Sequence, residues 1–543
     1  MPWYRLSTDV LPLLITVSPL VGMVTTIVAA RWNRALVRPL AVSNATFTLI
    51  LIAVAICLRP AAESDGLREA SKSPPGIEWL ASTTVTERGP AFSGIRVRMG
   101  WWLNGISIWS AGLVALVVWA VFCRPDGIAG GSSVSNFARL LTCQGLLSAS
   151  TFSSDGIASI VFLEMAAVPI YLVIGQSGDG NRRQVAGSWW TWQLIGGTCS
   201  LIGVTLLAVS QPWMQAEFVP NRLNMSFDSQ FLTQGIQQLL HRSETALHIW
   251  STVGPWSSAM LLLALLIRLP TFPFQGWYQA TLMSAPTPAS AIIAVAFPLA
   301  AFGNWLRWGM PLFGFHSGLL TAMLAVAALT GLLYVGIAAQ SQSDLKRLLV
   351  LMSLAMLCVS GISLSFRSVD GVRAAWMMML SHALSIPCGL LLVQMIEARA
   401  GTRDLLQLSA FISAEPRLAV LLNLLLLGWT GVPFLAGFSS LYQQLAGATS
   451  VGLWLILGEA VGLVALAAAG LRAIALIKNE ESVPGRERSK GAVLNSCDTG
   501  NNREIFALAP FIILLVAVNV VPAYFVPAAD ATVPSRYRNT NHP

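Results

Sequence analysis

Charged residues are scarce in this chain, and their scarcity decides the class of protein. Asp, Glu, Lys and Arg make up only 11% of the 543 residues, whereas a soluble protein carries about 25%. Hydrophobic residues make up 55%, and the mean hydropathy is +0.66. These values exclude an ordinary soluble domain and predict an all-α, polytopic membrane protein made mostly of spanning helices.

Several kinds of site are also missing from the sequence. The seven cysteines form no CxxC pair or ligand cluster, so we expect no zinc or iron–sulfur site and no metal in this chain. No glycine motif of the usual phosphate-binding or dinucleotide-binding kind is present. The net charge of +8 is spread over short loops, where basic residues set topology. We therefore expect the lipid bilayer, and no nucleic acid, as a partner.

Long apolar runs supply the architecture. Runs of about 18 residues or more predict about fourteen transmembrane helices. They lie near residues 10–30, 40–58, 103–122, 136–152, 157–176, 188–209, 256–280, 284–305, 316–338, 345–365, 374–396, 416–445, 451–477 and 504–525. The first run is longer than a signal-peptide core and has a weak basic flank, so we interpret it as a spanning helix.

Basic residues in the short loops predict the orientation. They concentrate on one side of the predicted spans, which the positive-inside rule assigns to the cytoplasm. Loops 31–39 and 478–503 are therefore expected to be cytoplasmic. The long loops 59–100 and 211–251 are expected to be extracytoplasmic, the second with a short surface helix near 231–241. We expect a multi-pass protein of the cell inner (plasma) membrane, with both termini outside the cytoplasm.

One stretch, LLLALLIRLPTFPFQGW at residues 261–277, combines a cation with a helix break. Pro270 and Pro273 directly follow Arg268, and proline removes a backbone donor and clashes with the preceding turn. A break at membrane depth has to be packed in protein or line a wet path. Arg268 is then either buried at a functional site or placed at a helix end, with its guanidinium reaching the headgroups.

A second interruption, GWTGVPFLAGFSS, lies five predicted spans later and contains Gly431, Pro433 and Gly437. Interrupted helices in corresponding positions indicate inverted repeats, although Pro and Gly are common in membrane helices in any case. We predict two inverted five-helix repeats with two broken helices. The expected division is 1–135 for the first three helices, 136–305 and 316–477 for the repeats, and 478–543 for a polar loop, the last helix and the tail.

Three further ionisable residues lie in or at the ends of apolar runs. Glu164 is the obvious partner for Arg268, either as a static pair or as part of a proton path. His382 suits proton relay, or is simply hydrogen-bonded in a core. Lys346 either belongs to the path or marks the cytoplasmic end of a helix. The predicted proton-path candidates are thus Glu164, Arg268, Lys346 and His382.

Six motifs in order resemble the antiporter-like membrane subunits of respiratory complex I, of the L, M and N types. Relatives of these subunits are Mrp antiporter subunits, membrane hydrogenase subunits and the membrane subunit of an inorganic-carbon uptake system. The motifs are FLEMAAVPIYLVIG, RLPTFPFQGW, APTPAS, SDLKRLL, SHALS with GTRD, and GVPFLAGFSS, between about residues 102 and 445. VPIYLVIG and GTRD look M-like, whereas PFQGW and GVPFLAGFSS look L-like.

The resemblance implies proton translocation along buried charged residues, coupled to redox change in partner subunits. NADH, FMN, iron–sulfur clusters and quinone would belong to those partners, and this chain would hold no cofactor. Carried over by position, Glu164 and His382 match the family's glutamate and histidine, Lys346 matches the lysine of its DLKR motif, and Arg268 takes the place of a lysine.

Other positions depart from the family pattern. Apolar residues replace ionisable ones at Ala294, Leu299, Met356 and Leu441. Arginine also holds its proton where lysine can release it. The alternatives are therefore a non-conducting scaffold subunit, or the membrane subunit of an Mrp-type antiporter or inorganic-carbon uptake system.

Overall fold

The computed structural model describes most of the chain. The described residues are 3–69, 76–81, 92–101, 104–124, 133–177, 180–215, 223–240, 242–313, 318–366, 368–409, 411, 415–428, 432–433, 435, 437–447, 453–478 and 502–525.

The chain begins with three long helices. A group of further helices follows, and it contains one helix break. The first three are α1 (Trp3–Trp32), α2 (Val37–Glu69) and α3 (Gly105–Cys123), with the 3₁₀ turn Arg34–Leu36 between the first two. The next group is α4 (Ser133–Phe152), α5 (Gly156–Ser177), α6 (Arg182–Gln215), α7 (Ser229–Leu240), α8 (Glu244–Arg268), α9 (Gly276–Ser284) and α10 (Thr287–Asn304). A π-helical turn, Trp305–Gly309, leads into α11 (Met310–Phe313).

A second group of helices follows. It consists of α12 (Gly318–Gln340), α13 (Leu345–Ser365), α14 (Val369–Ala400), α16 (Pro416–Gly428), α17 (Phe438–Gly447) and α18 (Leu453–Lys478), followed by α20 (Asn502–Val520) and α21 (Pro522–Phe525). Each group contains one interruption, between α8 and α9 in the first and between α16 and α17 in the second. Both predicted breaks are present.

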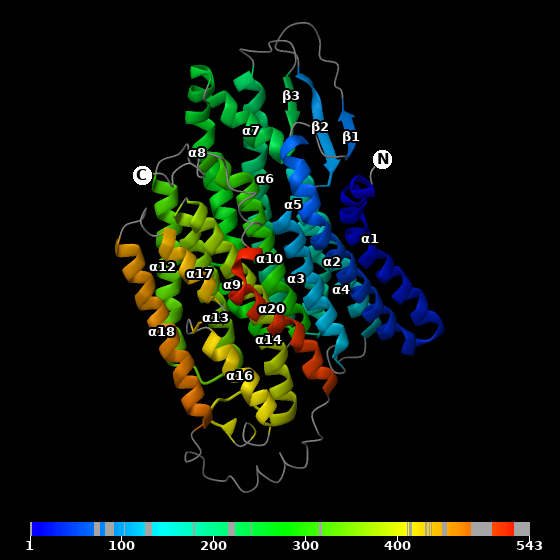
Figure 1. Cartoon of the computed structure of the whole chain (residues 1–543), viewed down its shortest axis with the longest axis vertical. Coiled ribbons are helices and arrows are strands. Elements are labelled where there is room, and N and C mark those ends of the chain that lie inside the picture. The colour runs from blue at the N-terminus through cyan, green and yellow to red at the C-terminus, as the bar shows by residue number, and fades with distance from the viewer. Residues whose placement is uncertain are drawn as a thin grey trace.

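Most helices lie roughly along the long axis of the molecule (Figure 1). The centre of the bundle is formed by α13 and α14. In the most apolar stretch of each of these two helices 100% of the residues are buried, compared with 39% in α1 and 33% in α18. Since α13 and α14 have no large outer face, polar side chains on them are shielded from lipid by protein.

The predicted number of fourteen spans is not confirmed. Among the described residues, 11 helices are long and apolar enough to cross a membrane, and two shorter apolar helices, Pro416–Gly428 and Ile505–Val520, accompany them. Helix α4 covers the predicted span near 136–152 but is not among the 11, because Ser, Thr, Gln and Arg139 lower its hydropathy.

Two predicted loops contain helices and strands, which corrects the sequence-based boundaries. α2 continues to Glu69, α6 to Gln215, and α8 already begins at Glu244. Three short strands, β1 (Gly76–Ala81), β2 (Phe92–Gly100) and β3 (Leu223–Ser226), form one sheet in the order β1-β2-β3. β1 and β2 are antiparallel, and β2 and β3 are parallel. Together with α7, which overlaps the predicted surface helix, the sheet lies at one end of the bundle (Figure 1).

Candidate functional site

The first helix break is buried at residues 269–271 and exposed at Phe272 and Pro273, and it has its own hydrogen bonds. α8 ends at Arg268 and α9 begins at Gly276, with Pro270 and Pro273 between them. The indole Nε1 of Trp277 donates to the Ile267 carbonyl at 3.0 Å, and the Phe274 N–H donates to the Thr271 carbonyl at 2.7 Å. The Trp277 side chain and the turn therefore pair backbone groups that the interrupted helix leaves without partners. Such pairing is needed in a membrane, because lipid offers no hydrogen bonds.

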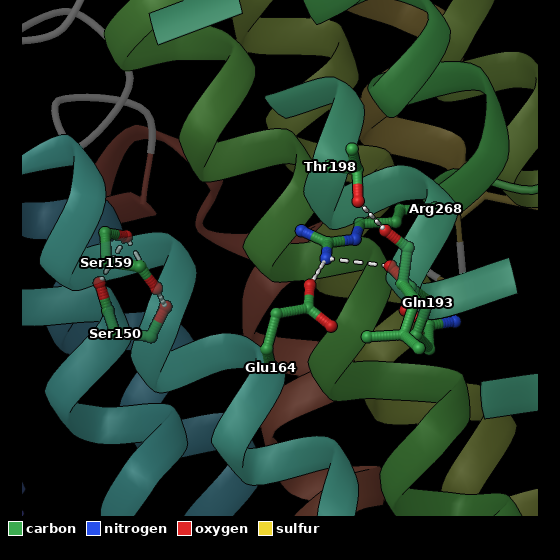
Figure 2. A network of polar contacts seen from close by, with 7 residues as sticks. Ser150, Ser159, Glu164, Gln193, Thr198 and Arg268 are labelled. Atoms are coloured by element: carbon green, nitrogen blue, oxygen red, sulfur yellow. Dashed lines mark hydrogen bonds and ion pairs between the residues drawn. The ribbon is translucent and has the colours of Figure 1, made fainter. Parts of the chain in front are cut away.

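Arg268 is buried at this break and contacts Glu164 (Figure 2). Only 1% of Arg268 is exposed, which rules out the headgroup placement. Its Nη2 donates to the Glu164 carboxylate on α5 and, at 3.3 Å, to the Gln193 carbonyl on α6. The contact predicted from the sequence is present, and three helices meet at it.

Two glycines of α6 make room for this ion pair. A Cβ on Gly197 would overlap the carboxylate of Glu164 and come within 3.0 Å of Arg268 Nη2. A Cβ on Gly196 would lie 3.1 Å from Arg268 Nε. Because any side chain here would push the charged groups apart, the Gly196–Gly197 pair is part of the site.

A small cavity of about 20 Å³ adjoins Arg268. Ser200 and Asn304 contribute polar groups to its lining, and Arg268 Nε and Nη1 and Asn304 Nδ2 have no hydrogen-bond partner within the described chain. A polar cavity of this size has room for one water molecule. The Ser159 Oγ lies 3.4 Å from Asn304 Oδ1. The same hydroxyl donates to the Ser150 carbonyl at 2.9 Å (Figure 2).

A second polar chain joins α9 to the centre of the bundle. The Tyr278 hydroxyl lies 2.6 Å from Ser353 Oγ on α13, and Ser353 Oγ lies 2.8 Å from His382 Nε2 on α14. All three side chains are buried, and His382 is 0% exposed. His382 Nδ1 has no partner in the described part of the chain. His382 is thus connected through two hydroxyls to the helix that follows the break.

Lys346 also contacts α9, but at a different place. It lies in the first turn of α13, whose N-cap is Asp344. Its Nζ donates to the Met283 carbonyl at 2.9 Å, and 7% of the residue is exposed. The four predicted residues therefore form a Glu164–Arg268 pair, a His382 chain and a Lys346 contact, and α9 is the element between them.

The second break is described only in part. α16 ends at Gly428 and α17 begins at Phe438. Pro433 lies in the break, and Gly437 has a φ of 83°, which favours glycine. Gly431 lies outside the described residues.

Sequence reasoning missed a buried acid that contacts the helix after this second break. Glu459 of α18 is 5% exposed, and Gln444 Nε2 of α17 donates to its Oε2 at 2.8 Å. An acidic residue inside an apolar run, the same signal that identified Glu164, was available in the sequence. Tyr278 and Ser353 carried no such signal, because uncharged hydroxyl groups are ordinary in helices.

The positions that depart from the family pattern are filled by packed apolar side chains. Leu299 is 2% exposed, Ala294 0% and Met356 6%, and Leu441 is partly buried against the core. No charge is available at these four positions.

The fold and these contacts define a class: a multi-span helical membrane protein with two interrupted helices and buried ionisable groups, of which Glu164 and Arg268 meet at the first break. The family model described as "NADH:quinone oxidoreductase/Mrp antiporter, TM" matches residues 153–467. The chain belongs to this family.

The chain is also similar to individual proteins. It is 24% identical over 365 residues to NADH-quinone oxidoreductase subunit M of Rickettsia felis, covering 67% of this chain and 68% of that protein. A chain of the archaeal membrane-bound sulfane sulfur reductase superposes with a TM-score of 0.72 at 16% identity, covering 97% and 98% of the two chains. A chain of respiratory complex I from Thermus thermophilus gives a TM-score of 0.68 at 20% identity, covering 96% and 99%.

Proposed function

We propose that this chain is an M-type, proton-translocating membrane subunit of an NADH:quinone oxidoreductase of the complex I kind. Protons would move along its buried ionisable groups while partner subunits carry out the redox chemistry. NADH, FMN, iron–sulfur clusters and quinone are assigned to those partners, and other membrane subunits are its neighbours in the complex.

The observation that carries the proposal is the buried Glu164–Arg268 pair at the first helix break. Opposite charges in a poorly solvated site attract strongly, so protonation of Glu164 would release Arg268 from it. Arg268 adjoins a polar cavity, and the break leads into α9, which contacts Ser353 and Lys346. A change in the Glu164–Arg268 contact would thus be transmitted through α9 to Ser353 and Lys346.

We also assign the division of the chain and its orientation as part of this proposal. The order α4, α5, α6, α8–α9, α10 and the order α12, α13, α14, α16–α17, α18 both place the interruption in the fourth member. This supports repeats at 136–305 and 316–477, between an N-terminal segment 1–135 and a C-terminal segment 478–543. Loops 31–39 and 478–503 are assigned to the cytoplasm, and loops 59–100 and 211–251 to the other side of the inner membrane.

Reconstitution of the whole complex tests the function. Glu164→Gln and His382→Ala each remove a proton-carrying group, so proton transfer along this chain should slow by about 10²-fold or more. Proton uptake into vesicles per NADH oxidised should fall, while NADH oxidation in uncoupled vesicles continues. His248→Ala on the exposed part of α8 is the control. Unchanged proton uptake in both Glu164→Gln and His382→Ala would remove the conducting role.

The buried apolar residues Leu299 and Met356 favour a second candidate, a subunit that couples or scaffolds without conducting. The same two variants decide between the candidates, because a scaffold would not respond to them. The proteins that copurify distinguish an uptake or antiporter system from an NADH:quinone oxidoreductase. Flavin and iron–sulfur subunits indicate an NADH:quinone oxidoreductase, and a soluble zinc protein indicates carbon uptake.

A further inference from the structure

Glu459 is an acidic residue within a candidate membrane span, and it is not one of the groups described around the first break. It lies in the second turn of α18, within the candidate span Trp454–Lys478. Other acids of the candidate spans lie at helix ends, as Glu244, Asp370 and Glu397 do, or contact an arginine, as Glu164 does. We propose that Glu459 is a proton-binding site of the second half of the chain, with Gln444 as its positioning residue. This inference rests on the proposed function.

The geometry leaves one carboxyl oxygen of Glu459 free. Gln444 Nε2 donates to Oε2 at 2.8 Å, whereas Oε1 is buried without a hydrogen-bond partner in the described part of the chain. An isolated buried charge is strongly unfavourable, and a proton on Oε1 removes that charge while the Gln444 bond persists. In each passage a proton binds to Oε1, forming one O–H bond, and the same bond breaks when the next acceptor takes the proton.

The charged groups on the neighbouring helices lie far from this carboxyl group. α12 and α17 contain no charged residue. Lys346 and Arg347 lie at the start of α13, near the opposite end of α18, because Arg472 of α18 donates to the Gln342 carbonyl just before them. Glu459 precedes Arg472 by 13 residues, which is about 20 Å along a helix. Arg417 lies at the start of α16, and the titratable Tyr442 of α17 is 69% exposed.

Glu164 and Glu459 lie at different positions of the two groups, on the second helix of the first group and on α18 at the end of the second group. Glu164 contacts Arg268, the last residue before the first break, and Glu459 contacts Gln444 on the helix after the second break. The difference is the partner: an arginine holds one carboxylate by charge, and an amide holds the other by a single hydrogen bond. An amide leaves protonation of Glu459 independent of a fixed cation, whereas Arg268 favours the charged form of Glu164.

Reconstituted whole complex carrying Glu459→Gln tests the proposal. The substitution keeps size and hydrogen bonding but cannot bind a transferable proton, so proton uptake per NADH should fall as in Glu164→Gln. Glu459→Asp should restore part of it. Glu397→Gln, the same change at the end of α14 in a residue whose side chain is 46% exposed, should behave as the unsubstituted complex. Normal uptake with Glu459→Gln overturns the assignment.

Labelling of the unsubstituted complex gives an independent result that needs no variant to assemble. An apolar carbodiimide modifies protonated carboxyl groups in membranes, and mass spectrometry of the α18 peptide should show modification at Glu459. An unmodified Glu459 overturns the assignment. If Glu164→Gln lowers uptake while Glu459→Gln does not, the proposed function stands without this site. If Glu164→Gln and His382→Ala also have no effect, the proposed function itself fails.

Discussion

Arg268 differs from a lysine at the same place in how firmly it holds its proton. The guanidinium keeps its proton in proteins, whereas lysine releases one readily when buried. Arg268 therefore stays a fixed cation beside Glu164, and Glu164 is the member of the pair that can change charge. Nη2 is bonded, whereas Nε and Nη1 have no hydrogen-bond partner within the described chain, and Arg268 also lines the adjoining cavity.

Gly197 should tolerate no side chain. Gly197→Ala inserts a methyl group between α6 and the Glu164–Arg268 pair, and overpacking of this kind costs about 1–3 kcal/mol. We expect lower thermal stability of the complex in detergent and reduced proton uptake per NADH. The control is Gly187→Ala on the same helix, where nothing lies within 4 Å of the added Cβ and the change should be neutral or stabilising. Equal behaviour of the two variants would contradict the tight fit.

Ser353 should matter more than its small size suggests. Ser353→Ala leaves both the Tyr278 hydroxyl and His382 Nε2 without their shared partner, and each buried unsatisfied group costs about 1–3 kcal/mol. Stability and proton uptake should both fall. Ser363→Ala on the same helix removes only a bond to the Val359 carbonyl of its own helix and should be nearly silent. The hydroxyl chain has no role in transport if Ser353→Ala pumps normally.

At this scale the sequence predicted the charged members of the site and missed the neutral ones. Glu164, Arg268 and His382 stood out because ionisable groups are rare in apolar runs. Tyr278, Ser353 and Gln193 did not, since their roles depend on which helices come together. Glu459 carried the same signal as Glu164 but lies near the start of its run, where an acid also fits a helix end.

The interrupted helix between α8 and α9 is stable because a side chain completes its backbone bonding. Trp277 is 4% exposed and bonds back across the break to Ile267. Its ring also meets Tyr278 edge to face at 5.6 Å. Trp277 thus couples the shape of the break to the residue that begins the hydroxyl chain.

Replacing Trp277 by Phe should therefore loosen the break. The change retains most of the apolar surface but leaves the Ile267 carbonyl without this donor, at a cost of about 1–3 kcal/mol. We expect faster thermal inactivation of the complex and more rapid amide hydrogen exchange over residues 266–278. Trp454→Phe, at a site 55% exposed, is the matched control. Unchanged exchange in Trp277→Phe would show that the turn alone holds the break.

Among the elements, the breaks were easier to predict than the ends of the helices. Proline and glycine mark a break locally, and both were found. The extensions of α2, α6 and α8 beyond their apolar runs, and the strands between them, were missed. Helix ends outside the bilayer and the pairing of β2 with β3 depend on contacts between distant segments, which hydropathy does not record.

At the scale of the whole molecule, hydrogen bonds between segments show which residues lie at the same end of the bundle. These positions can be used to test the orientation in the membrane. Arg38 of α2 donates to the Phe122 and Cys123 carbonyls of α3, so Arg34 lies at the end of the bundle where α3 finishes. Asn136 of α4 bonds Ser177 of α5 at this same end, just before Arg182. Gly156 of α5 bonds Phe227 at the other end, where α7 leads to Arg242.

Single cysteines at these arginines should therefore react from opposite sides of the membrane. In a background with Cys57, Cys123 and Cys497 replaced by Ser, the remaining cysteines are buried. An impermeant maleimide should then label Arg34→Cys and Arg182→Cys only in inside-out vesicles, and Arg242→Cys only in right-side-out vesicles. The reversed pattern would leave the bundle intact and invert its orientation. Labelling of all three from one side would mean that an even number of spans separates residues 182 and 242, whereas this arrangement places one candidate span, Arg182–Met214, between them.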